Sequence, residues 1–145
     1  MTTEAAPNRH ADLAAVAQQF GLADIYVFGS RAREISGHQS GAGVIAHSGS
    51  DVDIAVRPLP GRVLSPADRV ELTIALERSL GVTMVDLLIL PEADAFLALA
   101  AIRGELLYCS DTVDQAEYEL YVLRRAGDLL PLELERQRIV LGGGR

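Results

Sequence analysis

The chain has 145 residues, of which 49% are hydrophobic and 23% are charged, a balance that suits one globular domain and excludes a disordered chain. All 13 basic residues are arginine, which excludes chemistry that needs a lysine, such as a Walker A phosphate loop or a Schiff base. The formal charge of -7 argues against direct nucleic-acid binding and favours a basic partner or carboxylates that hold metal ions.

Neither a membrane segment nor a secretory signal is expected. No run of about 18 apolar residues occurs, and the N-terminal segment is polar and carries Pro7. The single cysteine, Cys109, cannot form an internal disulfide. We therefore expect a cytoplasmic protein that does not engage a membrane.

A helix and a strand are predicted first. Asn8 is placed to cap the helix and Gly21 to end it, and its apolar residues recur at helical spacing: Leu13, Val16 and Phe20. The β-branched and aromatic run 25–28 is too short for a helix and predicts a strand that ends at Gly29. Ser30 follows as the expected cap of a short second helix.

A long loop and a half-buried strand come next. Segment 36–50 is rich in glycine and serine and has no sustained period, which predicts a loop. The run 51–56 alternates, which predicts a strand with Asp51 and Asp53 on one face. Its other face is expected to lie in the core through Val52, Ile54 and Val56.

A strong helix start follows at Ser65, with proline at the first helical position and Asp68 at the third. The helix is expected to end at Gly81 and to bury Val70, Ile74, Leu76 and Leu80. The remaining elements are predicted in this order: a strand at 82–90, a helix at 93–103, an edge strand at 105–108, a helix at 111–127 and a last segment at 132–141. Helices and strands alternate throughout, which favours one sheet covered by helices.

Asp51 and Asp53 are candidate metal ligands. Side chains at i and i+2 of a strand share a face, about 6.5–7 Å apart along the backbone. Such a pair can bracket two divalent ions about 3.5–4 Å apart, as in phosphoryl-type transfers. Hard oxygen ligands select magnesium or manganese. The alternative is that both carboxylates face water on an edge strand.

Asp86 is the third candidate, because it interrupts an otherwise apolar strand. If it were buried there as a lone ion it would cost several kcal/mol, whereas a metal shared with the other two aspartates would remove that cost. The alternative is an aspartate at a strand end that bonds a loop or an arginine.

Gly29 and Ser30 are the candidate phosphate site. A strand that runs into glycine and then a helix-capping serine presents free N–H groups and a hydroxyl to an anion. Arg31 and Arg33 are placed to neutralise a triphosphate or the departing pyrophosphate. Both arginines are equally compatible with an ordinary surface position.

Three motifs together resemble the polymerase-β superfamily of nucleotidyltransferases, and more closely its minimal nucleotidyltransferase (MNT) branch. They are Phe-Gly-Ser-Arg-Ala-Arg at 28–33, Ser-Asp-Val-Asp-Ile at 50–54 and Val-Asp-Leu at 85–87. The resemblance covers about residues 10–108 and implies an α/β (α+β) fold with a small mixed sheet. The interval between the first two motifs is longer than is usual in that family.

The resemblance also implies roles for the candidate residues. Gly29 and Ser30 would hold the phosphates of ATP, with Arg33 beside them. Asp51 and Asp53 would bind two magnesium ions. Asp86 would share the catalytic ion and help to deprotonate the attacking hydroxyl.

The chain is interpreted as a single nucleotidyltransferase domain, 1–145, with a C-terminal helical extension at 109–145. That extension is too short for an acceptor-binding domain, so we expect another chain to present the acceptor. In the MNT branch, the resemblance implies that this chain is a HEPN-type ribonuclease toxin, a small helical protein. The MNT protein, as its antitoxin, would transfer AMP from ATP to a toxin tyrosine.

Three function classes stay open at this stage. They are the AMP-transferring antitoxin, a non-catalytic antitoxin that neutralises its partner by binding, and a stand-alone nucleotidyltransferase for a small hydroxyl compound. The extension fits a docking role or packing on the chain's own core through its apolar residues: Val113, Leu120, Leu123, Leu129, Leu130, Leu134 and Ile139.

Overall fold

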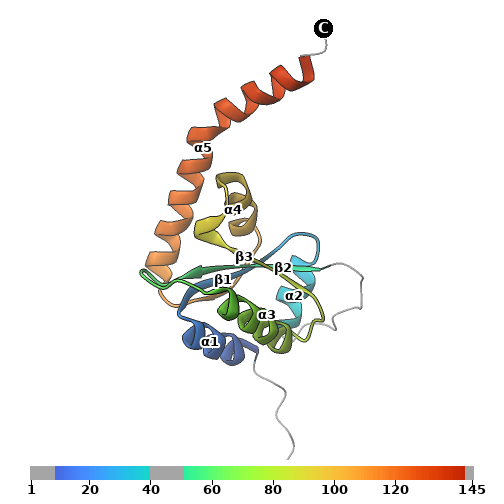
Figure 1. Cartoon of the computed structure of the whole chain (residues 1–145), viewed down its shortest axis with the longest axis vertical. Coiled ribbons are helices and arrows are strands. Elements are labelled where there is room, and N and C mark those ends of the chain that lie inside the picture. Colours follow the sequence, from blue (N-terminus) through green and yellow to red (C-terminus); the bar gives the residue numbers. More distant parts are fainter. Residues whose placement is uncertain (1–8, 40–50, 143–145) are drawn as a thin grey trace, which may run out of the picture.

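The computed structural model describes residues 9–39 and 51–142. Within these ranges helices and strands alternate in the predicted order (Figure 1). The elements are α1 (Arg9–Phe20), β1 (Leu22–Phe28), α2 (Ala32–Gln39), β2 (Val52–Pro58), α3 (Pro66–Leu80), β3 (Val85–Ile89), the 3-10 helix η1 (Leu90–Glu92), α4 (Ala95–Ile102), β4 (Glu105–Cys109) and α5 (Thr112–Gly142).

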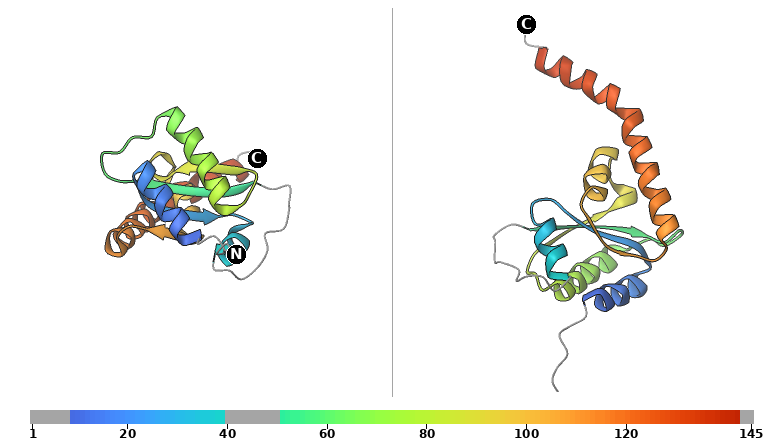
Figure 2. Two further views of the ribbon diagram at one scale, coloured as in Figure 1. Left: turned by 90° about the horizontal axis from the view of Figure 1, so that it is seen from below. Right: turned by 180° about the vertical axis from the view of Figure 1, so that it is seen from behind.

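The four strands form one mixed sheet in the order β3-β2-β1-β4. β1 pairs antiparallel with β2 and with β4, and β2 pairs parallel with β3. Helices α1 and α3 cover one face of the sheet, while α4 and the first part of α5 cover the other (Figures 1 and 2). The small mixed sheet with packed helices is therefore confirmed.

The core lies on both faces of the sheet. Alternation along β2 sends Val52, Ile54 and Val56 into the cluster shared with α1 and α3, as predicted. Ala55 points the opposite way, into a smaller cluster that includes Leu90 and Val122. Residues on β2 that alternate with the first set, Asp53 among them, therefore face α4 and α5.

The first helix agrees with its prediction. Its three predicted core residues are buried: Leu13, Val16 and Phe20. Gly21 ends the helix with φ +69°, a backbone conformation that glycine adopts without steric cost. The predicted cap, Asn8, lies outside the described residues.

The second helix corrects two predictions. It continues to Gln39, so the predicted loop does not begin at Ser36; residues 40–50 lie outside the described ranges. Arg31, rather than Ser30, occupies the N-cap position, because the Arg31 carbonyl accepts the N–H of Ile35 at 3.1 Å.

The third helix begins as predicted. The hydroxyl of Ser65 accepts the Asp68 backbone N–H at 3.0 Å, and the Asp68 carboxylate accepts the Ser65 backbone N–H at 2.9 Å. The predicted burial of Val70 and Ile74 is wrong: they are 61% and 44% exposed. The buried residues lie on a neighbouring side of the helix, at the i, i+4 and i+8 positions Leu72, Leu76 and Leu80.

We expect Ser65→Ala to lower the free energy of unfolding by about 0.5–2 kcal/mol, because it leaves the Asp68 N–H without its acceptor. Ser65→Thr keeps a hydroxyl and is the matched control. Chemical denaturation of the full chain measures both. Equal stability of the alanine variant and the wild type would contradict the contribution of the cap.

The C-terminal segment is one helix and not two. α5 runs through Pro131, which cannot donate to the carbonyl of Gly127. Figure 1 shows that α5 bends along its length and that its far half projects beyond the sheet, as expected when one hydrogen bond is missing. No helix in residues 9–39 and 51–142 combines the length and apolarity that crossing a membrane requires.

Candidate functional site

Three strand ends meet at one end of the sheet. β1 leaves the sheet there at Phe28 and continues into Gly29 and Ser30, whereas β2 and β3 begin there. The register sets Phe28 opposite Asp53, and Asp53 opposite Asp86. The segments that the sequence singles out for phosphate and for metal chemistry therefore lie side by side.

Asp53 and Asp86 form a carboxyl pair on the sheet face that α4 covers. Ala55 and Leu88, two residues further along their strands, pack on that face. Partial burial raises the pKa of the Asp53 carboxyl, and the charge of Asp86 and a hydrogen bond between the two carboxyl groups raise it further. Two like charges held this close repel, so a cation between them would be stabilising.

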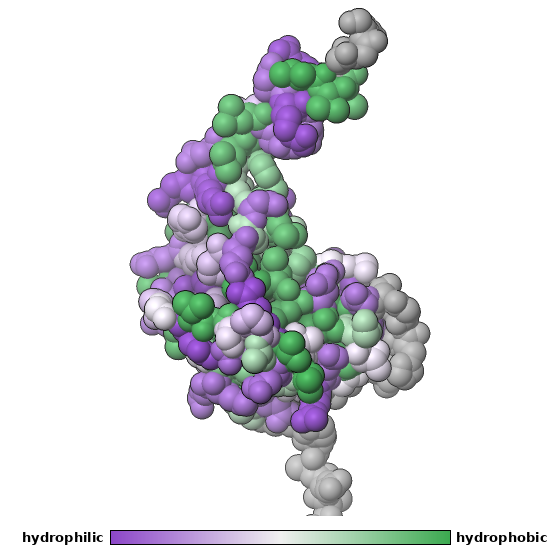
Figure 3. Space-filling view, in the orientation of Figure 1, coloured by the Kyte–Doolittle hydropathy of each residue, from purple (hydrophilic) through white to green (hydrophobic). Residues whose placement is uncertain are grey.

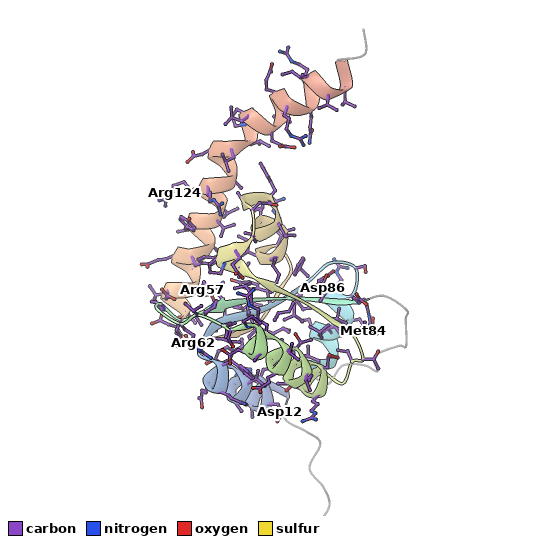
Figure 4. All side chains as sticks on the ribbon, in the orientation of Figure 1. Asp12, Arg57, Arg62, Met84, Asp86 and Arg124 are labelled. Carbon is purple, nitrogen blue, oxygen red and sulfur yellow. The ribbon has the colours of Figure 1, made fainter. Side chains whose placement is uncertain are left out.

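The burial expected of Asp86 is wrong. Its side chain is exposed, because β3 is an edge strand whose outer side no further strand covers. Figure 4 labels Asp86 at the same end of the sheet as α2. The desolvation argument for a metal therefore does not apply to Asp86, but the register does bring it to Asp53.

Asp51 stands next to this pair. It is exposed just before β2 begins, and its charge contributes to the raised pKa of Asp53. Among the residues that the structure describes, no three His, Cys, Asp or Glu side chains are already gathered around one metal position. The Asp53–Asp86 pair is formed, and the exposed Asp51 side chain would have to turn toward it to complete a ligand set.

These residues nevertheless suit a magnesium ion in their chemistry. All three donors are carboxylates, which are the hard oxygen ligands that magnesium prefers. Burial raises the pKa of Asp53, and the charges of Asp86 and Asp51 raise it further, as expected where carboxylates gather. No arginine forms an ion pair with any of the three in the described part of the chain: the salt bridges there all involve other acids.

Gly29 packs directly against this carboxyl pair. Its φ is +80°, and a Cβ built on it would lie 2.4 Å from Oδ2 of Asp53. The positive φ favours glycine, and any side chain here would have to displace the Asp53 carboxylate. The turn after β1 and the aspartate pair therefore form one site.

We expect Gly29→Ala to reduce the activity of this site about 100-fold, because a methyl group must displace the Asp53 carboxylate by an ångström or more. Gly61→Ala is the matched control: Gly61 has φ +81° and nothing within 4 Å of its Cβ position. The control carries the same backbone strain without the clash. Equal activity losses in both variants, measured as the nucleotide transfer that the resemblance implies, would contradict a role for the close approach of Gly29 to Asp53.

The arginines of the phosphate motif differ in their surroundings. Arg31 is buried and bonds Glu34 through Nε at 3.2 Å, so it stabilises the start of α2. Arg33 is exposed in the first turn of that helix, and Ser30 is exposed in the turn before it. Of the two arginines, Arg33 is the one turned toward solvent.

A buried polar network at the opposite end of the sheet was not predicted. Arg57 bonds Asp24 at 2.5 Å and Asp114 of α5 at 2.7 Å, and its guanidinium lies 4.6 Å from the centre of the Tyr118 ring. Tyr26 donates to Glu119 at 2.9 Å. These contacts, which we call the polar network, fix the first turns of α5 on the sheet.

One feature of the sequence, the position of Arg57, could have indicated the polar network. Arg57 lies four residues after Asp53 in an alternating strand, so it points to the same covered face. A charged residue at such a position requires a partner. That partner could not be named, because it depends on the register between β1 and β2.

Cys109 does not have the environment of a nucleophile. It ends β4, one residue beyond the predicted strand, and is half-buried. Burial raises the pKa of its thiol, and the charges of Asp24 and Asp111 raise it further, so the thiol stays protonated at neutral pH.

The comparison with protein families identifies one match. The family described as "Polymerase beta, Nucleotidyltransferase" matches residues 12–113, a range that contains every candidate residue above. Among curated proteins, none matches this chain.

Solved structures share the fold over almost the whole chain. A toxin–antitoxin structure with AMP-PNP is 24% identical, covers 94% of this chain and 98% of its own, and has a TM-score of 0.63. The complex of a tri-AMPylated Shewanella oneidensis HEPN toxin with an MNT antitoxin is 23% identical, covers 94% and 97%, and has a TM-score of 0.60. A mutant of the toxin–antitoxin MntA-HpeT is 24% identical with the same coverage as the first and a TM-score of 0.64.

Proposed function

Because the chain belongs to the polymerase beta nucleotidyltransferase family, we propose that it transfers AMP from ATP to a tyrosine hydroxyl of a HEPN-type toxin and acts as the antitoxin of that toxin. The observation that carries the catalytic part is the Asp53–Asp86 carboxyl pair packed against Gly29. The toxin partner is supported by solved structures of similar fold, one of which is a complex with a tri-AMPylated HEPN toxin.

The residues of the site divide into two groups in this proposal. Gly29 and Ser30 would bind the phosphates of ATP, because both are exposed in the turn between β1 and the start of α2. Arg33, exposed beside them, would neutralise phosphate charge. Asp51, Asp53 and Asp86 would hold two magnesium ions.

The reaction forms one bond and breaks one. The toxin tyrosine oxygen attacks the α-phosphorus of ATP, and the bond from that phosphorus to the bridging oxygen of pyrophosphate breaks. Asp86, exposed at the edge of the sheet, would accept the tyrosine proton. Bound magnesium would stabilise the negative charge on the α-phosphate and on the departing pyrophosphate.

Incubation of the purified chain with its HEPN-type partner protein, ATP and magnesium tests the proposal. We expect the mass of the toxin to increase by one or more AMP units, on tyrosine, and EDTA to prevent the increase. Tight complex formation without AMP transfer would instead show an antitoxin that acts by binding alone. Transfer to small hydroxyl compounds without any protein partner would show a stand-alone enzyme.

A further inference from the structure

An unpartnered apolar stripe follows the outer side of α5. Successive members are three, four or seven residues apart, and these spacings keep them on one side of the helix. They are exposed by 46% to 86% of their surface. We call them the outer stripe: Val113, Leu120, Leu123, Leu130, Leu134 and Leu141.

A different side of α5 holds the helix to the sheet. Val122 and Ala126 are buried there, at 2% and 4% exposure. Tyr118 of the polar network lies under Arg57, and Gln115 donates to the Tyr26 hydroxyl. No described residue covers the outer stripe, and Figure 3 shows apolar surface along α5 out to its far end. For every member of the outer stripe except Leu141, the sequence left packing on the chain's own core open, and their exposure argues against it.

The spacing of the outer stripe is suited to a helix as its occupant. Its members, with Ala116 and Gly127 between them, recur every 3.5 residues on average from Val113 to Leu134. A period of 3.5 residues is the heptad period of coiled coils, in which the side chains of two helices interlock. A strand would match a period of two instead.

Charge distinguishes a foreign helix from a second copy of α5. Arg124 lies one turn after Leu120, at the border of the outer stripe, and Figure 4 shows it pointing away from the sheet. Within residues 9–39 and 51–142 no acid pairs with it, whereas Arg136 and Arg138 have Glu133 and Glu135. Two copies of a chain with a formal charge of -7 would repel each other.

We propose that the outer stripe binds one amphipathic helix of the toxin, with a carboxylate of that helix opposite Arg124. The inference rests on the proposed function, which supplies a helical partner, and it adds the surface by which that partner is held. The site of AMP transfer lies at the other end of the sheet from the root of α5, so docking and chemistry use separate residues of this chain.

The test compares two variants of α5 in the full chain. Leu134→Glu places a charge in the outer stripe at a residue that is 56% exposed, and Ile139→Glu places one at a residue that is 61% exposed. Ile139 is five residues further on, which turns it by about 140° around the helix. Titration calorimetry against the purified HEPN-type protein should show binding about 10- to 100-fold weaker for Leu134→Glu and unchanged for Ile139→Glu.

Three results would overturn the inference. The first is wild-type affinity of a Leu120→Glu/Leu134→Glu double variant that keeps its helical circular dichroism. The second is an equal loss of affinity in the Ile139→Glu control. The third is a dimer of the chain alone, seen by light scattering, that Leu134→Glu dissociates, because a second copy would then occupy the outer stripe.

Failure of the proposed function gives a different result. If the toxin binds through the outer stripe but gains no AMP, the transfer reaction is refuted while the docking surface stands. If toxin binding is lost in Leu134→Glu while magnesium-dependent binding of ATP to the chain is kept, the two sites are shown to be separate.

Discussion

Asp53→Asn is expected to lower AMP transfer about a thousandfold or more while the chain stays folded. Asp53 lies at the centre of the three aspartates. It is paired in register with Asp86, the charge of Asp51 raises its pKa, and its side chain lies against Gly29. An amide keeps the shape of the side chain but removes the charge that holds a divalent ion. Transfer of AMP to the toxin, followed by mass spectrometry, measures the effect.

The stability of the same variant gives an independent check. The pKa of Asp53 is raised above its ordinary value of 3.8 by burial and by Asp86, so the folded state binds this proton more tightly than the unfolded state does. The stability that this provides is full below about pH 4 and is lost as the pH rises through the raised pKa. At neutral pH, and without metal, Asp53→Asn should therefore be as stable as the wild type or more stable.

Asp12→Asn is the control for both measurements. Asp12 is exposed in the first turn of α1, on the other face of the sheet (Figure 4), and its substitution should leave transfer unchanged and lower stability by no more than about 1 kcal/mol. Full transfer by Asp53→Asn would contradict the assignment of Asp53 as a metal ligand. Unfolding of Asp53→Asn at neutral pH would contradict the like-charge repulsion that we infer between Asp53 and Asp86.

The approach of Asp53 to Asp86 could be predicted only on the condition that their strands are neighbours, which the structure confirms. Alternation fixes the face of each residue within its strand, but the strand predicted at 82–90 begins at Val85, which places Asp86 near its start beside Asp53. The exposure of Asp86 could not be predicted in the same way. An apolar run does not reveal whether its strand lies at the centre or at the edge of a sheet, and β3 lies at the edge.

The helices show the same limit. The sequence of α3 holds two apolar stripes, and the one that contains Leu72 and Leu76 was buried in place of Val70 and Ile74. Periodicity alone cannot choose between two stripes, because the choice depends on where α1 and the sheet already lie. The sequence predicted a break between 127 and 132, but α5 is continuous there, and the bend in Figure 1 accommodates Pro131 within one helix.

The two ends of β2 connect the candidate site to the docking surface. Asp53 and Arg57 project from the same face, four residues and about 13 Å apart along the strand. Asp53 belongs to the candidate site, and Arg57 holds α5 through Asp114 and Tyr118. A toxin bound along α5 would therefore be held at a fixed position relative to the aspartates, which is what transfer to one of its side chains requires.

Arg57→Met is expected to lower the free energy of unfolding by about 3–5 kcal/mol, which is a large part of the stability of a small domain. Asp24 is fully buried, Arg57 is the cation that bonds it, and the second carboxylate oxygen of Asp24, Oδ1, has no partner within the described residues. Burial raises the pKa of Asp24, and Arg57 offsets part of that rise. Methionine fills similar space but leaves the carboxylate without its cation.

The pH dependence and two further variants identify the cause of this loss. Without Arg57 the pKa of Asp24 rises further. The loss of unfolding free energy should therefore shrink as the pH falls, because Asp24 becomes protonated in the folded and in the unfolded state. Asp24→Asn combined with Arg57→Met removes the uncompensated charge and should recover a large part of the stability. Arg78→Met, at an exposed position of α3, should change stability by less than about 0.5 kcal/mol. A deficit that does not vary with pH and persists in the double variant would show that Arg57 acts through packing on Tyr118 rather than through Asp24.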